Sequence, residues 1–114
     1  MVNGFPKRNK LCGKLRIAQL YKEGKRIVAW PLRVCWHYSE GETEVLVWAP
    51  KSLFKHAVDR NNLRRLMREA YRLNQGILGD KHYRIAFNYM DKELQSFSVI
   101  EKGMKKALTK IAEH

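Results

Sequence analysis

Residues 55–71 read KHAVDRNNLRRLMREAY, and the spacing of their side chains predicts a helix. An apolar arc of roughly 120° on a wheel of about 100° per residue contains Leu63, Leu66, Met67, Ala70 and Leu73. On the other side, an arc of roughly 140° holds the set that we call the arginine stripe, Arg60, Asn61, Arg64, Arg65, Arg68 and Arg72. Such a helix is expected to pack its apolar side on a sheet and to expose the stripe.

The overall charge of the chain indicates what the arginine stripe binds. The 114 residues include 23 Lys plus Arg against 11 Asp plus Glu, which gives a net charge of +12. Such a charge favours a polyanionic partner. A planar guanidinium also donates paired hydrogen bonds to phosphate and to guanine better than an ammonium does. We therefore predict a nucleic-acid partner, and the alternative is a basic surface without a ligand.

Other features of composition exclude several classes of protein. Cys12 and Cys35 form no CxxC or Cys/His motif, so neither a zinc site nor a disulfide framework is predicted. No apolar run reaches the roughly 18 residues of a membrane helix, and a cytoplasmic location without membrane contact is expected. The length favours a single domain over residues 1–114, in which residues 1–10 form a basic, loosely ordered arm.

The remaining patterns predict an α+β fold with the element order α-β-β-β-α-β-α. Besides the helix that carries the arginine stripe, the sequence predicts a helix within 11–24 closed by Gly24 and a last helix with Asp91 as its N-cap. The predicted strands are two segments in 26–38 separated by Pro31, and strands over 44–50 and 83–89. The acidic segment 39–44 predicts a hairpin between the strands that flank it, and residues 74–80 predict a loop. The last helix is expected to bury Leu94, Phe97, Ile100, Met104, Leu108 and Ile111.

Alternation along the strands predicts a core face and an open face of the sheet. In 32–38 and 83–89 the predicted core set is Leu32, Val34, Trp36, Tyr83, Ile85 and Phe87. In 44–50 the larger Leu46 and Trp48 are assigned to the core, which leaves Val45, Val47 and Ala49 on the open face. An extended nucleic-acid strand could lie on that face, with Arg33, Lys51 and Arg84 at its phosphates. The alternative is an exposed face without a ligand.

Residues 57–71 resemble the signature of the bacterial ribonuclease P protein. In that family an Ala-Val pair is followed by Arg-Asn, two spacers, two basic residues, two more spacers and Arg-Glu. The matching positions here are Ala57, Val58, Arg60, Asn61, Arg64, Arg65, Arg68 and Glu69. The likeness extends to KRNKL at 7–11, to Gly24, and to the order of the predicted elements.

The resemblance implies both a fold and a function. The family fold is a small two-layer α/β sandwich with a left-handed β-α-β crossover. Ribonuclease P removes the 5′ leader of precursor tRNA, and its catalyst is an RNA that binds Mg²⁺, so the resemblance implies no catalytic or metal-binding residue in the protein. The implied partners are that RNA, through the arginine stripe, and precursor tRNA, with no obligate protein partner. The leader cleft would use Ile17, Tyr21, Arg33, Cys35, His37, Ala49 and Lys51.

This chain departs from the family pattern at several positions, and one of them is Ile17 of the predicted cleft. The family usually has phenylalanine where this chain has Ile17, so base stacking there is expected to be weaker or to depend on Tyr21.

Three other classes of protein are less consistent with the sequence. A ribosomal or general RNA-binding protein does not require the Arg-Asn signature, a DNA-binding regulator needs mixed readout residues, and an autonomous nuclease needs clustered acids for its metals.

Overall fold

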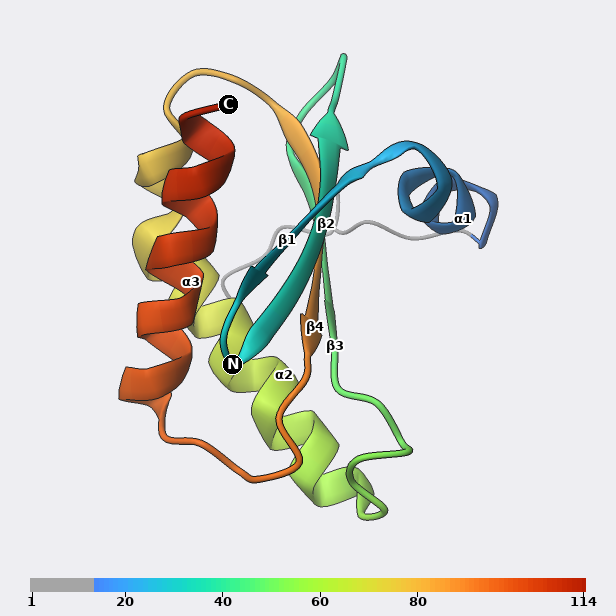
Figure 1. Cartoon of the computed structure of the whole chain (residues 1–114), viewed down its shortest axis with the longest axis vertical. Coiled ribbons are helices and arrows are strands. Elements are labelled where there is room, and N and C mark those ends of the chain that lie inside the picture. Colours follow the sequence, from blue (N-terminus) through green and yellow to red (C-terminus); the bar gives the residue numbers. More distant parts are fainter. Residues whose placement is uncertain (1–13) are drawn as a thin grey trace.

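The computed structural model describes residues 14–114, which form one four-stranded sheet with helices on both of its faces (Figure 1). The elements are α1 (Lys14–Glu23), β1 (Lys25–Ala29), β2 (Leu32–Tyr38), β3 (Glu44–Trp48), α2 (Ala57–Asn74), the 3-10 helix η2 (Gln75–Leu78), β4 (Tyr83–Tyr89) and α3 (Phe97–Ala112). The predicted α+β order is confirmed, and η2 occupies part of the predicted loop. The basic arm expected over residues 1–10 lies outside the described residues.

The strand order is β1-β2-β4-β3, so the hairpin predicted between β2 and β3 is wrong. β4 lies between them, antiparallel to β2 and parallel to β3. The physical reason is burial, because β4 carries Ile85 and Phe87 on one face and the fully buried Ala86 on the other, which suits a central strand. The chain leaves β3, passes through α2 and returns in β4, and this crossover is left-handed, as the resemblance implied (Figure 1).

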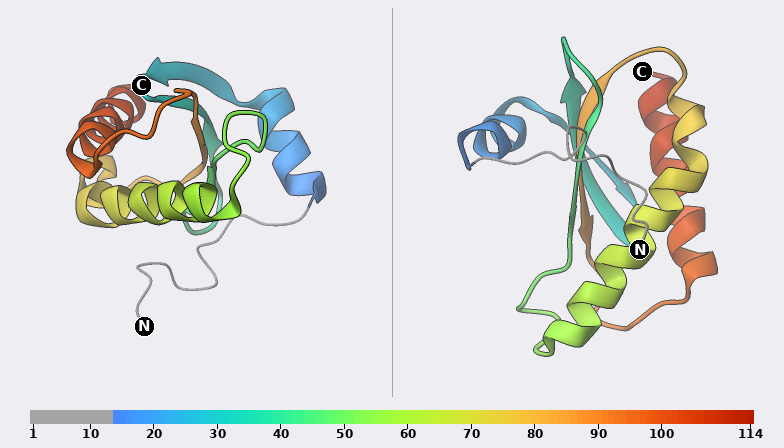
Figure 2. Two further views of the ribbon diagram at one scale, coloured as in Figure 1. Left: turned by 90° about the horizontal axis from the view of Figure 1, so that it is seen from below. Right: turned by 180° about the vertical axis from the view of Figure 1, so that it is seen from behind.

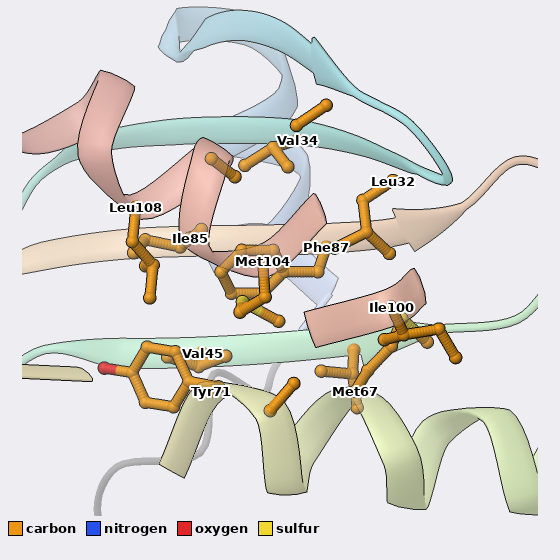
Figure 3. Close-up of a cluster of buried hydrophobic side chains, with 14 of the residues drawn as sticks. Leu32, Val34, Val45, Met67, Tyr71, Ile85, Phe87, Ile100, Met104 and Leu108 are labelled. Carbon is orange, nitrogen blue, oxygen red and sulfur yellow. The ribbon is translucent and has the colours of Figure 1, made fainter. Parts of the chain in front are cut away.

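Helices α2 and α3 lie side by side on one face of the sheet, whereas α1 lies on the other (Figure 2). The main core fills the space beneath α2 and α3. Figure 3 shows side chains from the strands meeting Met67 and Tyr71 of α2 and Ile100, Met104 and Leu108 of α3. The predicted core sets of β2 and β4 are confirmed. Leu73, which was assigned to the apolar side of α2, is mostly exposed beyond the sheet.

The predicted face assignment of β3 is wrong. Val45 and Val47 point into the main core with Ala49, and Leu46 lies on the α1 side of the sheet. β3 has large apolar residues at both parities, and side-chain size did not decide its face. Its parallel register with β4 did, because this register pairs Val45 with Ile85 and Val47 with Phe87. Trp48 is therefore turned away from the core and is 48% exposed.

The last helix begins five residues later than predicted, because its N-cap is Ser96 instead of Asp91 and its first residue is Phe97. Ser96 is its N-cap, and the Ser96 hydroxyl accepts a hydrogen bond from the Val99 amide at 3.4 Å. Asp91 instead accepts a hydrogen bond from the Glu93 amide at 3.0 Å, which stabilises a turn before the helix. Leu94 belongs to that connection and is mostly exposed, so its assignment to the buried face of α3 is wrong.

Candidate nucleic-acid interface

The α1-facing side of the sheet carries its side chains in rows that run across the strands. At one end a charged row contains His37, Arg84 and Glu44. The middle row contains Arg26, Cys35, Ala86 and Leu46. At the other end is a row that we call the open row, and it contains Val28, Arg33, Asn88 and Trp48. Helix α1 crosses this face, so the rows differ in what a ligand can reach.

The middle row is covered by α1. Leu20 packs on Cys35 and Ala86, and Ile17 and Tyr21 pack around this cluster while remaining half-buried. The Cys35 thiol donates a hydrogen bond to the Leu20 carbonyl at 3.4 Å. Burial raises the pKa of the Cys35 thiol, although the Arg26 guanidinium opposes this shift. Cys35 therefore supports α1 from below, and its predicted place on an open cleft surface is wrong.

The charged row ties α1 to the sheet. Glu44 is only 8% exposed, and its carboxylate accepts hydrogen bonds from Arg16 of α1 and from Nε of Arg84, the latter at 3.2 Å. Arg84 was expected to contact phosphate, but its guanidinium instead neutralises this buried carboxylate. His37 lies in the same row and is exposed. It is thus separated from the open row by the residues beneath α1.

Arg33 and Asn88 of the open row form the floor of a groove of about 590 Å³ beside α1. The groove is lined by Tyr21, Arg26, Arg33, Pro50, Ser52, Leu53, Asn88, Tyr89 and Met90. The Tyr21 hydroxyl and the Asn88 side chain are in hydrogen-bond contact at 3.0–3.2 Å. Arg26 donates to the Tyr21 carbonyl at 2.7 Å, which fixes the helix end at the groove wall. The structure therefore brings Tyr21 together with Arg33, as the cleft prediction required.

Three other predicted cleft residues occupy different positions. Lys51 is exposed in the turn that follows β3, next to Ser52 of the groove wall. Ile17 lies on the side of α1 that packs against the sheet, and it does not line the groove. Ala49 is fully buried in the main core, so its predicted role is wrong. The reason is the reversed parity of β3 described above.

The arginine stripe lies along α2, and its residues are exposed or half-exposed. Arg64 donates to the amide oxygen of Asn61, and Arg72 forms an ion pair with Glu69. Burial lowers the pKa of Arg68, and the charges of Arg64 and Arg65 lower it further. The smaller part of this shift comes from crowded positive charge, which a phosphate group would relieve.

Arg60 has a second role that the sequence did not reveal. Its guanidinium donates hydrogen bonds to the carbonyls of Phe54 and Lys55, at 2.8 and 2.9 Å. These carbonyls belong to the segment that leads into α2, so Arg60 closes the entry to the helix. The N-cap residue His56 makes no side-chain capping hydrogen bond. Arg60 donates to carbonyls that precede the helix, so it fixes this segment but cannot accept hydrogen bonds from the free amides of the first turn.

Trp48 is the residue that sequence reasoning missed. Its indole lies at the β3 edge of the sheet, and the Arg64 guanidinium carbon lies 5.9 Å from the ring centroid. This is a cation–π contact between the open row and the arginine stripe. The one signal in the sequence was Glu44, which is charged and has the same parity in β3 as Trp48.

Neither a metal cluster nor a membrane helix is found in the described part of the chain. Residues 14–114 contain no group of three or more His, Cys, Asp and Glu side chains placed to hold a metal ion. Two carboxylates beside the basic surfaces, Glu44 and Glu69, are paired with arginines. Among the described helices, none is long and apolar enough to cross a membrane.

Comparison with known proteins identifies the family. The family model described as Ribonuclease P matches residues 5–112. A ribonuclease P protein component of Porphyromonas gingivalis is 36% identical, over 96% of this chain and 87% of the relative. One from Chlorobaculum tepidum is 33% identical, over 76% of this chain and 68% of the relative.

Solved structures show the same fold. The RNase P protein from Thermotoga maritima superposes with a TM-score of 0.78 at 20% identity, covering 89% of this chain and 96% of that one. The Staphylococcus aureus RNase P protein gives 0.77 at 17% identity, covering 92% and 95%. The chain therefore belongs to the ribonuclease P protein family, whose members are protein components of the endoribonuclease that processes the 5′ end of tRNA.

Proposed function

We propose that this chain binds the catalytic RNA of ribonuclease P through the arginine stripe and the 5′ leader of precursor tRNA through the groove. The observation that supports this most is the arrangement of two basic surfaces on one small domain. The stripe lies along α2, and the groove opens beside α1 on the other face of the sheet. One protein could therefore contact two RNA segments at once.

The stripe residues would contact phosphates of the catalytic RNA. Arg64, Arg65 and Arg68 form its centre, where their mutual proximity favours an anion. Asn61 and Arg72 extend this surface toward the two ends of α2. Arg60 is already bonded to two carbonyls, so part of its contribution would be to hold the helix entry in place.

The groove would hold the leader in an extended conformation. Tyr21 offers a partly exposed ring at its wall, and Arg26 and Arg33 supply positive charge along it. Lys51 lies in the adjoining turn and would contact the backbone of the same strand. Because Ile17 packs against the sheet, stacking of a leader base near α1 would depend on Tyr21.

The chemistry of leader removal would belong to the RNA and its Mg²⁺ ions. Glu44 and Glu69, two carboxylates beside the basic surfaces, are engaged by guanidinium groups. The protein would act by neutralising phosphates and by binding substrate, so it would lower the magnesium concentration needed for cleavage. The proposal includes a cytoplasmic location, where the RNA partners of a bacterial protein are found.

Reconstitution with a bacterial ribonuclease P RNA tests the leader assignment. We expect the holoenzyme to bind precursor tRNA with a leader more tightly than tRNA without one. Arg33→Ala should reduce this difference several-fold, whereas Lys106→Ala, on the exposed side of α3, should leave it unchanged. Equal affinities for the two substrates in the wild-type holoenzyme would refute the groove assignment.

The stripe assignment is tested by varying magnesium. Arg68→Ala should slow precursor cleavage most at low magnesium, with recovery as the magnesium concentration rises, because metal ions replace the lost positive charge. A rate loss of the same size at every magnesium concentration would contradict this role. Circular dichroism and unfolding curves serve as the folding control, since Arg68 lies on the outer part of α2.

A further inference from the structure

Trp48 is a large aromatic side chain in a place where a core residue was expected. It ends the edge strand β3, and its indole is 48% exposed although the remainder of β3 is mostly buried. A single exposed tryptophan is common on protein surfaces, so its neighbours must decide whether it has a role. Arg64 covers part of the ring at 5.9 Å from its centroid, and the rest of the exposed surface is open to solvent.

The position of Trp48 connects the two surfaces of the proposed function. Trp48 is paired in register with Asn88, and Asn88 is paired with Arg33, so all three lie in the open row. Neighbouring strands are about 4.8 Å apart, which places the indole one strand beyond the groove floor. On its other side the ring meets Arg64 of the arginine stripe. A strand of RNA that leaves the groove along the open row would thus reach Trp48 before it reached the stripe.

We propose that Trp48, oriented by Arg64, is a stacking site for one unpaired nucleobase at the junction of the groove and the arginine stripe. The inference rests on the proposed function and adds a site to it. Stacking on an aromatic face is tolerant of sequence because every base has a π face. Arg64 would hold the indole by its cation–π contact and would meet the phosphate next to the stacked base. The base could come from the leader or from the catalytic RNA.

The chain offers a matched control at the opposite edge of the sheet. Trp30 is 53% exposed and lies in the β1–β2 turn, whereas Trp48 lies on β3. Trp30→Leu therefore removes an equally exposed indole far from the stripe. Trp48→Leu keeps an apolar side chain but removes the aromatic face, and Trp48→Phe keeps a smaller face. If stacking is responsible, the loss of RNA affinity should be largest for Trp48→Leu and smaller for Trp48→Phe.

The test uses the reconstituted holoenzyme and precursor tRNA with 2-aminopurine at one leader position at a time. If the base belongs to the leader, the wild type should quench one position and Trp48→Leu should abolish that quench. Affinity for the leadered substrate should then fall by roughly 5- to 140-fold, given the usual range for one stacked base. Trp48→Phe should keep part of both signals, and Trp30→Leu should keep all of them.

If the base belongs to the catalytic RNA, Trp48→Leu should weaken binding of the protein to that RNA in the absence of substrate by a similar factor. Unchanged binding of Trp48→Leu both to the catalytic RNA and to the leadered precursor would overturn the inference. That outcome differs from failure of the proposed function, in which the wild-type protein itself would show neither binding to the catalytic RNA nor a leader-dependent affinity.

Discussion

At the residue scale, Gly24 shows how the cap of one helix depends on close packing. Its amide donates to the Leu20 carbonyl at 2.7 Å, which confirms the predicted end of α1. The glycine is required for space, because its backbone φ is not positive. A Cβ at this position would lie 2.6 Å from the Leu20 carbonyl oxygen and 2.9 Å from that of Trp36. Both atoms belong to the backbone, so neither can move without displacing α1 or β2.

Gly24→Ala is therefore expected to lower the free energy of unfolding by about 1–3 kcal/mol, the usual cost of overpacking. Urea denaturation measures this change. Gly41→Ala is the control, since a Cβ at Gly41 meets nothing within 4 Å. Equal stability of the two variants would show that the contact between α1 and the sheet can relax.

Tyr71 gives a prediction for alkaline pH. It packs in the core beside Phe87, and burial raises the pKa of Tyr71 to about 12. Between about pH 10 and 12 the unfolded chain ionises this tyrosine while the folded chain does not, so stability falls as pH rises. The slope from this residue is at most about 1.4 kcal/mol per pH unit. Tyr71→Phe should remove that slope, and parallel curves for the two proteins above pH 10 would contradict the assignment.

At the element scale, α1 is the helix least supported by apolar contacts. Among the described side chains of α1, only Leu20 is buried. The ion pairs of Glu44 with Arg16 and Arg84 supply a second attachment to the sheet. By contrast, α2 and α3 share the main core. α1 should therefore open locally more often than the other helices.

Glu44→Gln should speed amide hydrogen exchange in residues 14–23 and leave α2 and α3 unchanged. The substitution removes the negative charge that Arg16 and Arg84 share, so α1 loses its polar attachment. Glu69→Gln is the matched control, because it breaks an exposed ion pair within α2. Hydrogen exchange with mass spectrometry reads all three helices at once. Faster exchange across the whole protein would instead indicate global destabilisation.

At the scale of the whole molecule, charge governs RNA affinity. With a net charge of +12, binding to the catalytic RNA should weaken linearly as the logarithm of salt concentration rises. Replacing Arg65 by Ala should reduce the magnitude of this slope by roughly 0.9, the value for one lost phosphate contact. Lys106→Ala should not change the slope, although it removes the same charge. Equal effects of both variants would mean that net charge, and not the arginine stripe, determines binding.

The sequence by itself determined that the helix over residues 57–74 has an apolar side and a basic side. It also determined the element order, the core-facing residues of β2 and β4, and the family. These depend on local periodicity, on charge and on one signature, all of which are readable along a single segment. It also placed Tyr21 and Arg33 correctly on one surface.

Only the tertiary structure decided the strand order, the face of β3 and the cover that α1 gives to Cys35. Each depends on contacts between segments far apart in the chain. β3 has large apolar residues at both parities, so side-chain size did not choose its face, and its register with β4 did. That choice buried Ala49 in the core and left Trp48 beside Arg64, where the groove and the arginine stripe meet.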